Sequence, residues 1–159
     1  MEETSRLEML IGNDLEKLKK AKILVFGVGG VGGWCAESLL RTGIGHLTLV
    51  DFDVVDRTNL NRQVVATSDN IGQSKVVEMQ KRLLTIYPEA DVQVIERQYN
   101  AETAVSFDLS QYDIVVDAID MVDCKALLLY NATHAGCKVF SSMGAGRKLN
   151  PLHIRTAEF

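Results

Sequence analysis

The sequence predicts an α/β protein with a doubly wound, mainly parallel sheet and helices on both of its faces. Short, continuous apolar runs recur along the chain, and such runs are typical of strands that are buried on both faces. Segments with the apolar spacing of helices separate these runs. Because strands that alternate with helices form parallel sheets joined by right-handed crossovers, we expect this architecture throughout the alternating region.

In the N-terminal half, a polar leader precedes the alternating region, and its Asn13 and Asp14 are candidate helix caps. The predicted elements are, in order, a short helix ending at Lys20, a strand over 23–26, a helix over 29–41 and a strand over 47–50. A polar loop over 51–69 follows the second strand. This loop is longer than the usual connection of about 2–6 residues, and long loops in compact domains are commonly functional.

In the C-terminal half, a helix stops before Pro88, because the residue before proline avoids helical conformation. The predicted elements are a helix over 74–87, a strand over 92–95, a short helix over 101–109, a strand over 114–116, a helix over 126–135 and a strand over 139–142. After Gly144 the alternation ends. Asn150-Pro151 indicates a turn, and 152–155 alternates like a half-exposed strand.

The composition excludes several classes of protein. With 159 residues, 47% hydrophobic and 24% charged, the chain has the length and composition of one folded domain. A net charge of −4 argues against a protein that coats nucleic acid through bulk charge. Three cysteines without a C-x-x-C pair indicate free thiols rather than a zinc site. The acidic, polar start lacks the features of a secretory signal, so we expect a cytoplasmic protein.

A glycine-rich segment follows the first predicted strand and opens the first predicted helix. It reads Gly27-Val-Gly29-Gly30-Val-Gly32, which fits the pattern G-x-G-x-x-G. Its glycines let the backbone approach a ligand closely, and the amides at the helix N-terminus favour phosphate. Asp51 lies nineteen residues after Gly32, where a carboxylate can accept hydrogen bonds from ribose hydroxyls. The pattern predicts a Rossmann-like fold that binds an adenine nucleotide, with tight packing at the glycines as the alternative explanation.

The long loop distinguishes a triphosphate from a dinucleotide. An NAD enzyme binds pyrophosphate on the glycine turn and needs no further cluster of Arg, Asn and Lys, whereas a triphosphate does need one. Asn59, Arg62 and Gln63 in this loop, together with Lys75 beyond it, form such a cluster. Asp120 follows the fourth predicted strand, and it is equally a candidate Mg²⁺ ligand and a candidate cap of the next helix.

Other residues near these motifs favour structural roles. Asp53 and Asp56 are typical turn-forming residues, and we do not expect them to bind a ligand. Trp34, on the first predicted helix, is expected to have a packing role.

Five segments together resemble the adenylating domain of the HesA/MoeB/ThiF family, which is related to the ubiquitin-activating enzymes. They are Phe26-Gly-Val-Gly-Gly-Val-Gly32, Leu49-Val-Asp-Phe-Asp53, Asn59-Leu-Asn-Arg-Gln63, Gly72-Gln-Ser-Lys75 and Asp117-Ala-Ile-Asp120. The resemblance implies an enzyme that uses ATP and Mg²⁺ to convert a carboxylate into an acyl-adenylate and releases pyrophosphate. Family members continue past the position equivalent to Phe159, so we expect residues 1–159 to be a single ATP-binding adenylating domain without the family's C-terminal segment.

The resemblance also implies roles for individual residues. Asp51 would bind ribose, Asp120 would bind the metal, and the phosphates would be bound by Asn59, Arg62 and Lys75. An N-terminal arginine reaches into the partner subunit's nucleotide site in this family, and Arg6 is the candidate here. The resemblance therefore implies a homodimer.

Within the family, two segments look most like the branch of tRNA threonylcarbamoyladenosine dehydratases. They are Asp117-Ala-Ile-Asp120-x-Val-x-x-Lys125 and Ser141-Ser-Met-Gly-Ala-Gly-x-Lys-x-Asn-Pro151, although Asn150 in the second segment stands where the branch usually has Asp. This likeness implies tRNA as the partner that carries the carboxylate, which is activated and then cyclises with loss of water. It also suggests cysteine desulfurase or sulfur-relay proteins as partners.

Three other functions stay open at this point. The first is adenylation of the C-terminal glycine of a ubiquitin-like sulfur-carrier protein, as in ThiF and MoeB, although those enzymes usually carry C-x-x-C zinc motifs. The second is an NAD-dependent oxidoreductase, which shares the glycine turn and Asp51 but has no role for Arg62 or Lys75. The third is a non-catalytic nucleotide sensor, which would bind ATP without releasing pyrophosphate.

Overall fold

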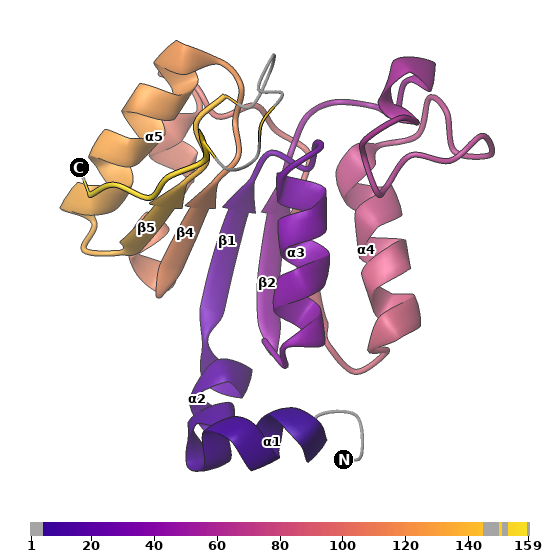
Figure 1. The fold of residues 1–159 in the computed structure, drawn as a ribbon. Helices are drawn as coiled ribbons and strands as arrows, with labels where there is room; N and C mark the ends of the chain where they lie inside the picture. The colour runs from indigo at the N-terminus through magenta and orange to yellow at the C-terminus, as the bar shows by residue number, and fades with distance from the viewer. Residues whose placement is uncertain (1–4, 145–149, 151–152, 159) are drawn as a thin grey trace.

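A computed structural model describes residues 5–144, 150 and 153–158, and shows one sheet of five strands (Figure 1). The strands are β1 (Lys22–Phe26), β2 (His46–Val50), β3 (Asp91–Ile95), β4 (Ile114–Asp117) and β5 (Lys138–Ser141). Their order is β3-β2-β1-β4-β5, and every neighbouring pair is parallel. The predicted doubly wound parallel sheet is therefore confirmed.

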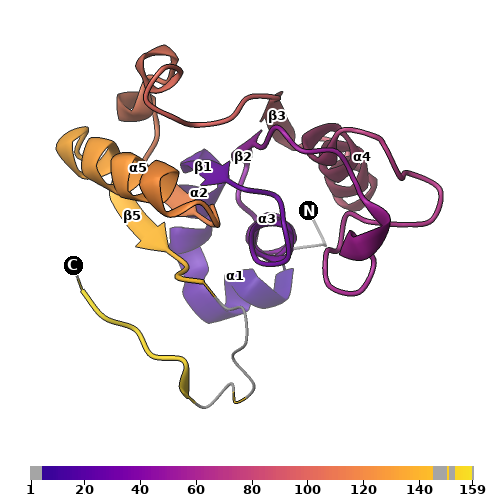
Figure 2. The same ribbon diagram turned by 90° about the horizontal axis from the view of Figure 1, so that it is seen from above.

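The main helices cover both faces of the sheet, as Figures 1 and 2 show. On one face, α3 (Gly32–Arg41) and α4 (Lys75–Ile86) contribute Leu40 and Met79 to a buried apolar cluster. On the other face, α5 (Val122–His134) contributes Leu128 to a second cluster. The described helices include none that is long and apolar enough to cross a membrane.

The central strand β1 shows why the sheet is buried on both sides. Ile23 and Val25 belong to the first cluster, whereas Leu24 and Phe26 belong to the second. Successive side chains of a strand point to opposite faces, so a continuous apolar run supplies both cores at once. Burial of these side chains stabilises each by about 1.5–3 kcal/mol relative to exposure.

The strand order changes direction at β1, and this topology positions the site. The chain moves from β1 outward to β2 and β3, and then returns to place β4 on the other side of β1. In open α/β sheets, ligands bind beyond the carboxyl ends of the strands at such a switch point. Two short backbone hydrogen bonds hold the strand ends together there, from Gly27 N to the Val50 carbonyl and from Ala118 N to the Phe26 carbonyl, each 2.8 Å long.

Several elements differ from the expectation. The leader forms α1 (Ser5–Ile11), which was not predicted, before a 3-10 turn and α2 (Leu15–Lys20). The prediction of a short helix over 101–109 was wrong, because this segment contains only a 3-10 turn at Ala104–Ser106. A second 3-10 turn, Leu109–Gln111, begins at its last residue. Residues 153–155 do not form the expected strand, and Pro151 and Leu152 lie outside the described residues.

A charged cluster joins the two helices of one face. Glu37, on α3, is buried and accepts hydrogen bonds from Arg41 at 2.9 Å and from Arg82, on α4, at 2.7 Å. Burial alone would raise the pKa of Glu37, but the hydrogen bonds from Arg82 and Arg41 outweigh it, so the pKa lies below its ordinary value. The folded state therefore favours the charged carboxylate.

We expect Glu37→Gln to lower the free energy of unfolding by about 1 kcal/mol at neutral pH, because both arginine side chains are partly solvated. Since the pKa is lowered on folding, this stabilisation is complete above the ordinary glutamate pKa and is lost as the pH falls through the lower folded value. Urea unfolding at neutral pH and below about pH 4 measures this. Glu89→Gln, at an exposed position, is the control, and equal midpoints for Glu37→Gln and the unmodified chain at neutral pH would contradict the prediction.

Candidate functional site

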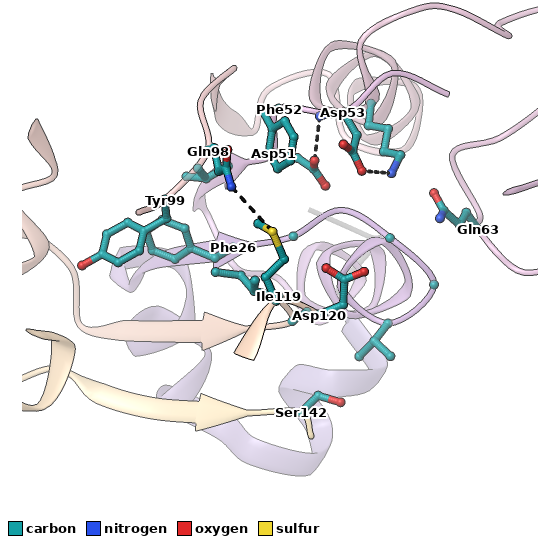
Figure 3. Close-up of a pocket in the computed structure, with 18 of the residues that line it drawn as sticks. Phe26, Asp51, Phe52, Asp53, Gln63, Gln98, Tyr99, Ile119, Asp120 and Ser142 are labelled. Carbon is teal, nitrogen blue, oxygen red and sulfur yellow. Dashed lines mark hydrogen bonds and ion pairs between the residues drawn. The ribbon is translucent and has the colours of Figure 1, made fainter. Parts of the chain in front are cut away.

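A cavity of about 660 Å³ opens at the carboxyl ends of β1, β2 and β4 (Figure 3). This volume lies within the range of small-molecule binding sites. Eight of the residues predicted to bind a nucleotide line it, namely Gly27, Gly29, Gly30, Asp51, Arg62, Gln63, Lys75 and Asp120. The fold therefore brings together residues that are separated by more than ninety positions in the sequence.

The glycine turn forms the floor of the cavity, and two of its glycines leave no room for a side chain. Gly27 has a φ of +86°, and a Cβ there would lie 2.6 Å from the Ala118 carbonyl oxygen. At Gly32, a Cβ would lie 1.8 Å from the Gly27 carbonyl oxygen. Within the described residues, the amides of Gly29 and Gly30 make no backbone hydrogen bond. These amides precede α3, so the turn offers unpaired donors at the positive end of a helix.

Asp51 connects the glycine turn to the end of β2. It is buried, and its Oδ2 accepts a hydrogen bond from Val28 N at 2.6 Å, while its Oδ1 accepts one from Asp53 N at 2.9 Å. These bonds fix the carboxylate at the cavity wall. A carboxylate in this position of a Rossmann-like fold can accept hydrogen bonds from ribose hydroxyls.

Two cations lie near the glycine turn. The aliphatic part of Arg62 packs over Gly30, where a Cβ would lie 3.4 Å from Arg62 Cγ. Lys75 is the first residue of α4, and only 5% of its surface is exposed. Its Nζ lies 2.7 Å from Asp53 Oδ2 (Figure 3). The cavity wall therefore carries a buried ammonium group, paired with Asp53, in the same cavity as Asp51. Arginine and lysine side chains are the groups that bind phosphate oxygens in proteins.

Asp120 faces Asp51 and Asp53 across the cavity (Figure 3). Its side chain makes no hydrogen bond with any residue that the structure describes. Helix α5 begins after Met121, and no side chain caps its N-terminus. Asp120 therefore does not cap α5, which was one of the two roles that the sequence left open. Its exposed carboxylate instead points into the cavity, as the other role, binding of Mg²⁺, requires.

Three predicted site residues do not line the cavity. Gly32 lies behind the turn, where it allows close packing. Asn59 is buried in the long loop, and its Oδ1 accepts a hydrogen bond from Asp56 N at 3.0 Å, so its observed contact stabilises the loop. Arg6 is exposed on α1, which lies at the opposite end of the sheet from the cavity (Figure 1). Phosphate binding by Asn59 and nucleotide binding by Arg6 stay predictions.

In the long loop, Asp56 caps the short 3-10 turn Arg57–Asn59. Asp56 accepts hydrogen bonds from both the hydroxyl and the amide of Thr58, and these bonds lower the pKa of its carboxyl. Together with Asn59, Asp56 forms a capping box around a short 3-10 turn. The prediction that Asp56 is a turn-forming residue is therefore confirmed.

Sequence reasoning missed several residues of the cavity. Asp53 lines it and pairs with Lys75, although it was expected to be a turn residue only. Residues that follow β3, β4 and β5 also line it, including Arg97, Gln98, Tyr99, Met121 and Ser142. Their position just after strand ends was the available signal, because all parallel strands end at the same edge. Burial raises the pKa of Tyr99, so its phenol stays protonated.

Trp34, for which a packing role is predicted, lies at the surface and contacts the long loop. The side chain is 52% exposed on α3, and its indole Nε1 donates a hydrogen bond to the Arg62 carbonyl at 3.1 Å. Trp34 thus holds the loop that carries Arg62 against the helix that follows the glycine turn.

The fold and the cavity define a Rossmann-like α/β domain whose glycine turn lies at the carboxyl ends of the parallel strands. The chain belongs to the ThiF family, whose model matches residues 4–154. It is 41% identical over 155 residues to a tRNA threonylcarbamoyladenosine dehydratase of Bacillus subtilis (strain 168), which covers 97% of the chain and 61% of the relative. It is 38% identical over 144 residues to the enzyme of that name from Escherichia coli (strain K12), covering 91% of the chain and 54% of the relative.

Solved structures show the same likeness. The E. coli tRNA N6-threonylcarbamoyladenosine dehydratase TcdA in complex with ATP superposes with a TM-score of 0.91 at 37% identity, over 95% of this chain and 63% of that one. By sequence alone, the chain is also similar to a sulfur carrier protein adenylyltransferase of Thermus thermophilus. The two are 37% identical over 66% of this chain and 38% of the relative. The chain spans less than two thirds of the length of the dehydratases it matches.

Proposed function

We propose that this chain is the ATP-binding, adenylating part of an enzyme that activates the carboxylate of threonylcarbamoyladenosine in tRNA. One observation carries the proposal: the buried Lys75 ammonium and the Arg62 side chain lie in the same cavity as the glycine turn and Asp51. A dinucleotide leaves these cations without a role, whereas a triphosphate requires them. The likeness to TcdA, whose structure was solved with ATP, supports the same conclusion.

Each wall of the cavity has a proposed role. The unpaired amides of Gly29 and Gly30 bind phosphate oxygens, and Arg62, Gln63 and Lys75 bind those farther from the ribose. The ribose hydroxyls donate hydrogen bonds to Asp51. The positive charges of Arg62 and Lys75 would thus lie next to the phosphates, which carry the negative charge of the nucleotide.

Asp120 is the proposed ligand of Mg²⁺. The donor set fits, because Mg²⁺ in nucleotide sites binds one or two carboxylates together with phosphate oxygens and water. The ion would offset phosphate charge opposite a carboxylate that has no other partner among the described residues.

In the proposed reaction, a carboxylate oxygen of the substrate forms a bond to the α-phosphorus of ATP, and the bond to pyrophosphate breaks. In the resulting acyl-adenylate, an atom of the carbamoyl group of the same nucleotide forms a bond to the acyl carbon and loses its proton. The bond between the acyl carbon and the AMP oxygen breaks, so the ring closes and AMP leaves. The chain's own residues act by orientation: the cations and amides hold the phosphates in line with the incoming carboxylate.

The proposed partners are tRNA and a second copy of this chain. The two dehydratase relatives support tRNA as the substrate. The position of α1 at the far end of the sheet supports a role for Arg6 outside its own cavity, in the partner's nucleotide site. A cytoplasmic location and contact with a cysteine desulfurase or sulfur-relay protein stay predictions.

Calorimetry with ATP and Mg²⁺, and separately with NAD, tests the nucleotide assignment on the unmodified chain and on Arg62→Ala. We expect ATP to bind and Arg62→Ala to weaken it by about tenfold or more, because a charge-assisted hydrogen bond contributes about 1.5–3 kcal/mol. Arg57→Ala is the matched control, since Arg57 lies in the same loop but does not line the cavity. Binding of NAD that is indifferent to Arg62 would overturn the proposal and indicate an oxidoreductase.

Pyrophosphate release tests the substrate. With ATP present, release should depend on tRNA that carries threonylcarbamoyladenosine, and should not depend on a ubiquitin-like sulfur-carrier protein. Release that requires the carrier protein would support the ThiF- and MoeB-like activity instead, and ATP binding without release in either case would indicate a nucleotide sensor.

A further inference from the structure

A buried ion pair lies outside the cavity, between two of its walls. Lys125, on α5, is 7% exposed and its Nζ lies 2.5 Å from Oδ2 of Asp117, which is fully buried at the end of β4. Neither residue lines the cavity, so neither is positioned to contact a bound nucleotide. The roles proposed above leave this pair unexplained.

The pair connects the two chain segments that enter the cavity from β4 and β5. On the β4 side, Asp117 Oδ1 accepts a hydrogen bond from Ile119 N at 3.0 Å, directly before Asp120. On the β5 side, Asp117 Oδ2 accepts a hydrogen bond from Ser141 Oγ at 2.6 Å.

The backbone of Ser142, the residue that follows β5, is hydrogen-bonded to the same pair. Lys125 Nζ donates to the Ser142 carbonyl at 3.0 Å, and Ser142 N donates to the Asp117 carbonyl at 2.8 Å. Ile119, Asp120 and Ser142 all line the cavity (Figure 3). The ammonium group thus joins the Asp117 carboxylate, at the end of β4, to the Ser142 carbonyl, just after β5.

Stability alone does not account for Lys125 at this position. Removing two charges from water is costly, and apolar residues of similar volume are often as stabilising as a buried ion pair. In addition, Lys125 is the fourth residue of α5, near the positive end of the helix, where a cation is disfavoured. What an apolar pair cannot provide is a directional link between Asp117 and the Ser142 carbonyl.

We infer that Lys125 is a positioning residue for the adenylation reaction. It sets the separation of the Ala118–Asp120 segment from the Ser142–Gly144 segment, and so directs the Asp120 carboxylate toward the phosphates. This inference rests on the proposed function. It predicts that a change at Lys125 weakens the binding of ATP with Mg²⁺. The binding of AMP without Mg²⁺ should change little.

The test compares binding of ATP with Mg²⁺ and binding of AMP without Mg²⁺ by calorimetry, together with thermal melting. Lys125→Met alone leaves Asp117 buried without its counterion, so the double variant Asp117→Asn with Lys125→Met removes both charges. Lys125→Arg keeps the cation, and Lys138→Met, at an exposed position on β5, is the matched control. We expect the double variant to fold, to bind AMP like the unmodified chain and to bind MgATP about tenfold more weakly or worse. Lys125→Arg should restore most of the MgATP affinity.

Two results would overturn the inference while leaving the proposed function intact. One is MgATP binding by the double variant that equals that of the unmodified chain. The other is a double variant that fails to fold, or whose affinities for MgATP and AMP fall by the same factor. Each of these outcomes would show that the Asp117–Lys125 pair only stabilises the fold. If the unmodified chain itself binds no ATP, the proposed function fails and this inference fails with it.

Discussion

Gly32→Ala is expected to destabilise the chain by about 3 kcal/mol and to abolish ATP binding. A Cβ at this position would lie 1.8 Å from the Gly27 carbonyl oxygen and 3.2 Å from Ala118 Cβ. The first contact involves backbone, which cannot move aside as a flexible side chain can. The turn must therefore open, and with it the backbone that connects β1 to α3.

Gly29→Ala is the matched control for this prediction. A Cβ there would meet only Gln63 Nε2, at 3.8 Å, which is an ordinary contact. Because Gly29 lines the cavity, we expect this variant to melt like the unmodified chain and to bind ATP more weakly. Urea unfolding and calorimetry on both variants measure the two effects, and a Gly32→Ala protein with unchanged stability would show that the turn tolerates a side chain.

Lys75→Met should reduce the affinity for ATP with Mg²⁺ by about 10- to 100-fold and leave stability nearly unchanged. Loss of a charge-assisted hydrogen bond to phosphate costs about 1.5–3 kcal/mol of binding free energy. Folding is little affected because the methionine side chain fills similar space and Asp53, whose side chain is 48% exposed, can be solvated when its partner is removed.

Calorimetry and thermal melting test this separation of binding from stability. Lys81→Met is the control, because Lys81 lies on the same helix with its side chain 66% exposed and away from the cavity. Equal ATP affinities for Lys75→Met and the unmodified chain would remove Lys75 from the phosphate site. A large drop in melting temperature would instead assign to the Lys75–Asp53 pair a role in holding α4.

The sequence alone determined the sheet and the central part of the site. The central strand β1 is a continuous apolar run from Ile23 to Phe26, because a parallel strand that is covered on both faces has no solvent-facing side chains. Strand β3, at the edge of the sheet, instead begins with alternating polar and apolar residues. The glycine turn and Asp51 were also predictable, because the backbone conformation and the strand-end carboxylate are local features of β1 and β2. The basic cluster of Arg62 and Lys75 followed from its proximity to them along the chain.

Local sequence patterns gave wrong or incomplete predictions for three helical segments. Over 101–109, Asn100 Oδ1 accepts hydrogen bonds from Glu102 N and Thr103 N, and such side-chain bonds compete with helix formation. Helix α5 begins at Val122, earlier than expected, because its exposed first residue conceals the helical period. Helix α1 buries no residue, so it carries no apolar period to detect.

Only the tertiary structure decided which polar residues meet. Asp53 reaches Lys75 because an antiparallel bridge pairs Val54 with Ser74, a contact that no local pattern records. Asp117 and Lys125 form one buried network with Ser142 because β4 and β5 lie side by side and end together. Propensity and periodicity describe what one segment prefers, whereas a binding site depends on distances between segments, and those distances exist only after the strands have been placed in order.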